Sequence, residues 1–492
     1  MSPKGLFLWT ASLVALLCPD SSASAQAPAV DFVWSGALQP TSIRIVTGLS
    51  AASDSVRVAL SAGDTFEEAY HTAYEATNEQ SRTASFRIEA LEPDTEYRYA
   101  VEVAGALDTL RVGRFRTPQE GPFSFRLIAA GCAQTGSDRP VFDVIRRQAP
   151  LFYLALGDFH YENIDSDDPE VYRQAWREVA ESPPQAALYR STPLAYIWDD
   201  HDFGPNNSDR MAPGREAARL AYQEMIPHYP LVAGQGNVPI FQSFSIGRLR
   251  FILTDLRSSR LPGRRAFGRT PTMMGARQKD WFKQELVRAK EAGEVIVWVS
   301  SVPWIYPESE SSDSWGGYYE EREEIANFIK EHAIDDIVIL GGDAHMVAMD
   351  DGTNSDYATG GGAPIPVIQS APLDQAGSSK GGPYSEGEFP GPTVFPPHPG
   401  QWTMMDVEDD GSDTVCMSWR AYRTRWDRPS SRPLVDMSRC FDVPAYQPPE
   451  PVADPASGGG TPAVEDRQGE AGTAPPADDG GRPEGQQPEG QL

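Results

Sequence analysis

The chain has 492 residues, a formal net charge of −28 and a pI near 4.6. This length allows two or three domains and a large hydrophobic core. The excess of acidic residues argues against non-specific binding to nucleic acids, which requires a basic surface. It suits an exported protein and the binding of divalent cations.

The first 25 residues predict a secretory signal peptide. Lys4 precedes a largely apolar run from Leu6 to Leu17, and the small residues that follow fit cleavage after Ala25 or Ala27. The apolar run is too short for a permanent membrane span, and no other segment is long and apolar enough for one. We therefore expect a secreted or periplasmic protein without a transmembrane segment.

Residues 28–117 predict a small all-β sandwich. Apolar and polar residues alternate in SIRIV, SVRVAL, ASFRI and TLRVGRF, as in half-buried strands. The segment LEPDTEYRYAVEV resembles the late-strand signature of fibronectin type III modules, with one apolar face made of Tyr97, Tyr99, Val101 and Val103. A plain β-sandwich with core tyrosines explains the same pattern, and neither interpretation assigns chemistry to this part.

After the linker PQEGP, residues 122–445 predict a second domain in which buried strands alternate with helices. The predicted strands are FRLIAAG, LFYLALG, PLAYIWD, LRFILTD, VIVWVSS and DIVILGG. The predicted helices are SDDPEVYRQAWREVAE, GREAARLAYQEMIPHY, GARQKDWFKQELVRAK and GGYYEEREEIANFIKEHA. The third helix is the clearest, because Trp281, Phe282 and Leu286 share one side. This alternation predicts an α/β domain with functional residues at the strand ends.

The last third of the chain predicts a loop, a hairpin and a tail. Residues 351–400 are rich in glycine and proline and predict a long irregular loop at the rim of the active site. QWTMMDVEDDGSDTVCMSWRAY predicts a hairpin, and residues 446–492 predict a disordered tail because they hold almost no large apolar residues. Cys416 and Cys440 could form a disulfide, which would leave Cys132 without a partner.

Side chains able to bind a metal or a phosphate follow five of the predicted strands. They are Cys132, Asp158 with Tyr161, Asp200 with His201, Asp255 with Arg257, and Asp343 with His345. The stretch IWDDHDFGPNNSD is especially acidic, and buried carboxylates without a positive partner are unfavourable. Two metal ions about 3.5–4 Å apart can clamp a phosphoryl group and lower the pKa of a water. The pattern therefore predicts cations at these strand ends.

The motif order GC-x-Q, GD-x-x-Y, DDHD and GGD-x-H resembles the alkaline phosphatase D family of the calcineurin-like metallophosphoesterases, over roughly residues 28–445. The resemblance implies an α/β metallophosphoesterase sandwich, with two β-sheets flanked by helices, preceded by the small all-β domain. It also implies hydrolysis of phosphate mono- or diesters, in which a bimetallic site activates water for in-line attack on phosphorus.

The resemblance implies a role for each site residue. The implied metal ligands are Cys132, Asp158, Tyr161, Asp200, Asp343 and His345. Asp158 would bridge both metals, the thiolate and phenolate would suit iron (Fe³⁺), and hard oxygen ligands would suit calcium (Ca²⁺). His201 would stabilise the phosphoryl oxygen or protonate the leaving group, and Arg257 would bind the phosphate bidentately. Near Ser301 many relatives have a metal-binding histidine, so the ligands of the second metal stay open.

Other interpretations of the same residues remain. Cys132 alone would be a buried structural thiol, and Asp255 with Arg257 would be an ordinary buried ion pair. A surface binding or adhesion protein with a structural metal site is the alternative function, although the intact DDHD and GGDAH motifs argue against it. The Gly-x-Ser-x-Gly match at residues 377–381 lies in the irregular loop, not at a strand-to-helix turn, and does not predict a serine hydrolase.

Overall fold

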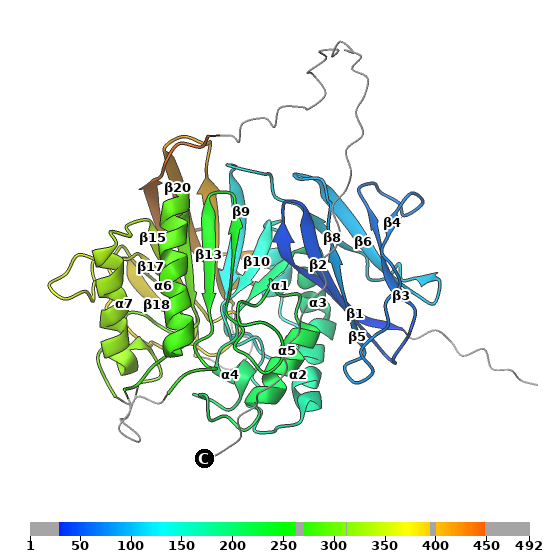
Figure 1. Cartoon of the computed structure of the whole chain (residues 1–492), viewed down its shortest axis with the longest axis horizontal. Coiled ribbons are helices and arrows are strands. Elements are labelled where there is room, and N and C mark those ends of the chain that lie inside the picture. The colour runs from blue at the N-terminus through cyan, green and yellow to red at the C-terminus, as the bar shows by residue number, and fades with distance from the viewer. Residues whose placement is uncertain (1–28, 262–269, 311, 394–399, 448–492) are drawn as a thin grey trace, which may run out of the picture. The chain divides into compact units, whose positions relative to one another are not determined.

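The computed structural model describes residues 29–261, 270–310, 312–393 and 400–447 (Figure 1). The predicted signal peptide and almost all of the predicted tail lie outside these residues. None of the described helices is long and apolar enough to cross a bilayer.

The described strands form three sheets. The ten-stranded sheet has the order β21-β20-β19-β9-β10-β11-β1-β2-β5, with β22 also paired to β20. Its strands are β21 (Arg428–Pro429), β20 (Thr414–Arg425), β19 (Gln401–Glu408), β9 (Phe125–Ala130), β10 (Phe152–Ala155), β11 (Leu194–Tyr196), β1 (Val30–Gln39), β2 (Ser42–Leu49), β5 (Thr83–Ile88) and β22 (Val435–Asp442).

The seven-stranded sheet has the order β12-β13-β14-β15-β17-β16-β18. Its strands are β12 (Gln242–Ile246), β13 (Leu249–Thr254), β14 (Val295–Ser300), β15 (Ile337–Gly341), β17 (Val367–Ser370), β16 (Met346–Asp350) and β18 (Gly387–Pro390). The five-stranded sheet contains β3 (Val56–Ser61), β4 (Tyr70–His71), β6 (Glu96–Val103), β7 (Ala106–Leu107) and β8 (Gly113–Arg116).

The helices flank the two large sheets, as Figure 1 shows for α6 and α7 beside the second sheet. They are α1 (Val141–Arg146), α2 (Pro169–Glu181), α3 (Pro183–Ser191), α4 (Asp200–Phe203), α5 (Arg215–Met225), α6 (Gly275–Ala292), α7 (Tyr319–Glu331) and the 3₁₀ helix η2 (Trp315–Tyr318). The predicted helices and strand runs are present, except that only the GRF end of TLRVGRF lies in a strand, and the prediction of two sheets flanked by helices is confirmed.

Strand β14 shows why the second sheet is buried on both faces. Val297 and Val299 belong to the core between the two large sheets. Ile296 and Trp298 belong to the core under the helices, where the rings of Trp298 and Phe282 lie 4.6 Å apart. Because successive side chains of a strand point to opposite faces, a continuous apolar run is what this position between layers requires.

Strand β1 joins the N-terminal part to the second predicted domain. It pairs in parallel with β11 through Gly36 and Leu194. The ten-stranded sheet therefore contains strands from both sides of the predicted linker at residues 118–122. A Cβ at Gly36 would lie 2.4 Å from the carbonyl oxygen of Leu194, so only glycine allows this approach. In the five-stranded sheet Tyr99 is completely buried, as the alternation in β6 predicts.

The C-terminal third differs in part from the prediction. Residues 351–400 are not one irregular loop, because they contain β17 and β18, which pair with β16. Residues 394–399 lie outside the described residues. The β19–β20 hairpin is present as predicted, and a disulfide joins Cys416 to Cys440 on β20 and β22. Cys132 is a buried free thiol.

Candidate metal centre

The ends of parallel strands bring the predicted ligands together. Cys132 follows β9, Asp158 follows β10, and these strands are parallel neighbours. Their loops are tied by hydrogen bonds from the Cys132 amide to the Gly157 carbonyl (3.2 Å) and from the Ala133 amide to the Asp158 carbonyl (2.9 Å). The carboxyl ends of parallel strands meet at one sheet edge, which is where α/β proteins place their sites.

The backbone at the site is strained. Cys132, Asp158, Asp343 and His345 have φ values of 64°, 53°, 54° and 52°, in the left-handed region that residues with a Cβ rarely adopt. Gly157 has a φ of 98°, and a Cβ there would lie 2.6 Å from the Cβ of Asp199. Strain of this kind persists only where the surrounding structure enforces it, and it clusters at functional sites.

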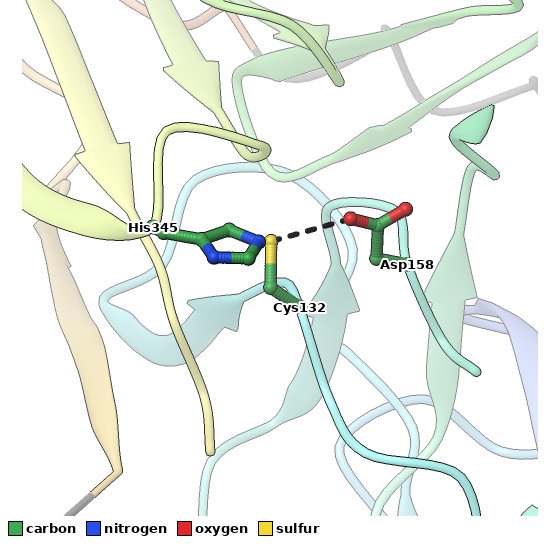
Figure 2. A group of neighbouring side chains, drawn as sticks. All are labelled: Cys132, Asp158 and His345. Carbon is green, nitrogen blue, oxygen red and sulfur yellow. Dashed lines mark hydrogen bonds between the residues drawn. The ribbon is translucent and has the colours of Figure 1, made fainter. Parts of the chain in front are cut away.

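One side of the centre combines sulfur, oxygen and nitrogen ligands. Figure 2 shows the Cys132 thiol next to the Asp158 carboxylate, with the His345 ring beside them. The Cys132 Sγ lies 3.5 Å from Asp158 Oδ2, and the Tyr161 hydroxyl lies 2.7 Å from the same oxygen. The Tyr161 hydroxyl also lies 2.9 Å from His345 Nε2, whose ring is oriented by a 2.7 Å contact from Nδ1 to the Ala376 carbonyl.

Asp158 is common to three groups of side chains whose ligand atoms lie within 4.8 Å of one another. The groups are Cys132, Asp158 and His345; Asp158, Asp200 and His201; and Asp158, Asp199 and Asp343. A carboxylate shared in this way can bridge two cations. Short helix α4 holds Asp200 and His201 in place, because the Asp202 carboxylate accepts hydrogen bonds from the amides of Asp199 and Phe159.

The electrostatics of the centre fit a cation. Burial, reinforced by the charge of Asp200, raises the pKa of Asp158 well above its ordinary value. Burial and the charge of Asp158 likewise raise the pKa of the Cys132 thiol and of the Tyr161 phenol. At the centre, the buried oxygens Asp158 Oδ1, Asp199 Oδ2 and Asp200 Oδ1 have no hydrogen-bond partner among the described residues. A bound cation satisfies such oxygens and favours the ionised thiol and phenol.

The model of the PhoD-like phosphatase family matches residues 127–379, about half of the chain. The chain belongs to this family. Alkaline phosphatase D of Bacillus subtilis (strain 168) is 25% identical over 201 residues, which are 35% of this chain and 34% of that protein. The alignment therefore spans about a third of the relative's length.

The solved structure of PhoD is similar to this chain with a TM-score of 0.66 and 16% sequence identity, and the similarity covers 85% of this chain and 91% of that chain. At this identity the likeness establishes the fold. The PhoD-like fold places the ends of β9, β10 and β15 around the metal centre, and membership in a phosphatase family with these ligand clusters indicates a metal-dependent phosphoesterase site.

Arg257, which was predicted to bind the phosphate, is held by carboxylates in the structure. The side chain is completely buried, and its guanidinium forms ion pairs with Asp199 (2.6 Å) and Asp313 (3.0 Å). It approaches Asp200 to 3.7 Å, whereas Asp255 accepts a hydrogen bond from the backbone amide of Arg257 and forms no ion pair with its guanidinium. A direct contact with a phosphate would require Arg257 to leave these carboxylates. The geometry favours a positioning role behind the metal centre.

Sequence reasoning missed Lys380. Its Nζ lies 2.6 Å from Asp343 Oδ1, and the loop that carries it reaches the centre because the Ser378 amide bonds to the His345 carbonyl. No pattern in QAGSSKGGPY indicates this contact, since it depends on how a glycine-rich loop folds back over 37 residues.

Three further residues around the centre are held by contacts within the chain. His160 is completely buried against Trp176, with ring centroids 5.7 Å apart. Ser301 stands where a histidine was expected, and its hydroxyl donates to Asp199 Oδ1 at 2.9 Å. Asn207 supports Asp200 through its backbone amide, which lies 2.6 Å from Asp200 Oδ2.

Proposed function

We propose that this chain is an exported hydrolase of phosphate mono- or diesters that uses a bimetallic site to activate water. The observation that carries the proposal is the position of Asp158, which belongs to all three candidate ligand groups. Membership in the PhoD-like phosphatase family supports the reaction class. Export rests on the predicted signal peptide, and N-terminal sequencing of the protein recovered outside the cytoplasm, with a start at Gln26 or Pro28, tests it.

The two sides of the centre suit different cations. Cys132, Tyr161 and His345 with Asp158 would hold iron (Fe³⁺), because a thiolate and a phenolate stabilise a ferric ion. Asp200 and Asp343 with Asp158 would hold calcium (Ca²⁺), which prefers oxygen ligands. When bound, the two cations would offset the charge of the phosphate and lower the pKa of the attacking water.

The protein's own residues orient the reactants and move the proton. Water forms the new bond to phosphorus in line with the ester oxygen that leaves, and His201 donates a proton to that oxygen. The His201 ring lies against Tyr161, with centroids 4.1 Å apart, and its Nδ1 has no partner among the described residues. His201 also belongs to a candidate ligand group, so the metal content of His201→Asn distinguishes an acid from a ligand.

Hydrolysis of bis-p-nitrophenyl phosphate and of p-nitrophenyl phosphate, measured before and after chelation, tests the proposal. We expect chelation to abolish activity and calcium to restore it where iron is retained. The ratio of the two rates ranks diesters against monoesters. Metal-loaded, folded protein that hydrolyses neither compound would contradict a general phosphoesterase and favour a binding protein with a structural metal site.

A further inference from the structure

The segment enclosed by the disulfide has the opposite charge to the rest of the chain. Between Cys416 and Cys440 lie six arginines, two aspartates and no lysine or glutamate, a formal charge of +4 in a chain of −28. The segment forms β20, β21 and β22, with β20 paired to both other strands. A basic hairpin on an acidic protein indicates an anionic partner.

The tip of the hairpin exposes a tryptophan. Arg425 pairs with Arg428 at the end of the β20–β21 ladder, so Trp426 and Asp427 form the turn. The Trp426 side chain is 87% exposed, and its φ is 59°. Asparagine or glycine would adopt this backbone at lower cost and would expose no apolar surface. A tryptophan that is unfavourable on both counts is best explained by a contact made outside the chain.

The arginines of the tip are not neutralised within the described chain. Arg425, Arg428 and Arg432 are exposed and form no ion pair with a described carboxylate. Arg147, at the end of α1, adds a further exposed guanidinium and donates to the Asp427 carbonyl. Arg420, lower on the same strand, is paired with Asp406, so its charge is offset inside the sheet. The unpaired charges therefore gather around Trp426.

We propose that this tip, formed by Arg147, Arg425, Trp426, Arg428 and Arg432, docks onto the surface of an anionic lipid bilayer. Tryptophan favours the headgroup level of a bilayer because its ring is apolar and its N–H is polar. Arginine clusters bind anionic headgroups. A bilayer would contact only the tip. A long soluble polyanion would also approach the acidic remainder of the chain, which would repel it.

The docking tip is rigidly connected to the metal centre. The sheet order β21-β20-β19-β9 leads directly to the loop of Cys132. β19 pairs with β9 through Thr403 and Ala129, and β20 pairs with β19 through Arg423 and Gln401. β20 therefore ends at the sheet edge from which the Cys132 loop departs. Docking itself does not depend on the proposed hydrolase activity.

Co-sedimentation of the mature protein with vesicles tests the proposal. We expect binding to vesicles of equal parts phosphatidylcholine and phosphatidylglycerol, and at least about tenfold weaker binding to phosphatidylcholine alone. Trp426→Ala and the double variant Arg425→Gln/Arg428→Gln should each weaken binding to the anionic vesicles by about tenfold or more. Leu110→Ala and Arg114→Gln, which change exposed side chains of the N-terminal part, are the matched controls and should bind as the wild type does.

Quenching of tryptophan emission by brominated lipids, at lipid concentrations that bind all of the protein, gives a second measurement that reports contact with the bilayer. We expect quenching in the wild type and its loss in Trp426→Phe, since Trp426 is the one exposed tryptophan among the described residues. Equal binding to both vesicle types, or unchanged binding of the tip variants, would overturn the proposal. Binding to soluble polyphosphate without binding to vesicles would also overturn it and would assign the tip to a soluble polyanion.

Discussion

Two adjacent clusters of carboxylates differ in how the negative charge of their buried members is compensated. In the Arg257 cluster, Asp199 and Asp313 share a guanidinium that never reaches solvent. In the metal centre, Asp158 and Asp200 keep carboxylate oxygens without hydrogen-bond partners in the described chain. The first cluster carries its own positive charge, and the second lacks enough of it. The comparison teaches that several unpartnered carboxylate oxygens gathered at one buried site favour the binding of a cation there.

His228 shows a third solution, outside both clusters. Burial lowers its pKa to about 4, the carbonyl of Tyr229 opposes this effect, and the nearby Arg44 reinforces it. The ring is 8% exposed and is stacked on Tyr222, with centroids 5.7 Å apart. It is therefore buried in its neutral form, which requires neither an ion pair nor a metal.

The largest effect is expected for Asp158→Asn. Activity should fall on the order of a thousandfold, and less metal should be bound, because an amide cannot bridge two cations. The metal-free variant should unfold at a higher temperature than the metal-free wild type, since a buried carboxylate among like charges is removed. Kinetics, metal analysis and thermal unfolding of the two metal-free proteins measure this.

Asp409→Asn is the matched control, because Asp409 is also buried but is paired with Arg248 far along the chain. It should lose stability and keep the activity of its folded fraction. Loss of stability in metal-free Asp158→Asn would show that the Asp158 carboxylate stabilises the fold without a metal. It would contradict the expected difference between the metal centre and paired acids such as Asp409.

Arg257→Met is expected to cost about 3–5 kcal/mol of unfolding free energy, because it leaves Asp199 buried without its cation, whereas Asp313 keeps its ion pair with Arg260. Denaturant unfolding measures the loss. Arg116→Met removes the exposed pair with Asp94 and should change stability by less than about 1 kcal/mol. An Arg257 variant with unchanged stability and a raised KM would instead support the direct phosphate contact that the sequence predicted.

The smallest effect is expected for His228→Gln and depends on pH. Between about pH 6.5 and 4 the unfolded chain binds a proton at His228 more readily than the folded chain. The wild type should therefore lose stability as the pH falls through this range, by about 3 kcal/mol once the pH is below 4. His228→Gln should lack this contribution.

Unfolding free energies of the wild type and of His228→Gln are measured across this pH range. The quantity compared is how each free energy changes with pH, which a constant change in stability caused by the substitution does not affect. His332→Gln, at an exposed histidine, is the control and should follow the wild type. Parallel curves for the wild type and His228→Gln would show that His228 is not buried in its neutral form.

The sequence by itself determined the strands, the helices and the order of the site motifs. Apolar runs such as VIVWVSS identify strands covered on both faces, since such a run has no other stable environment. The residues just after these runs must lie at the strand ends, so the approach of Cys132 to Asp158 followed from pattern alone. The same local logic predicted the β19–β20 hairpin from its turn.

Only the tertiary structure decided which charges meet. Arg257 and Asp313 are 56 residues apart, and Lys380 reaches Asp343 through a loop without a readable pattern. The pairing of β1 with β11 likewise depends on distant segments, whereas the sequence already indicated Cys416 and Cys440 as a possible disulfide. A sequence pattern reports the local preference of a segment, whereas ion pairs and sheet order depend on the packing of segments far apart in the chain.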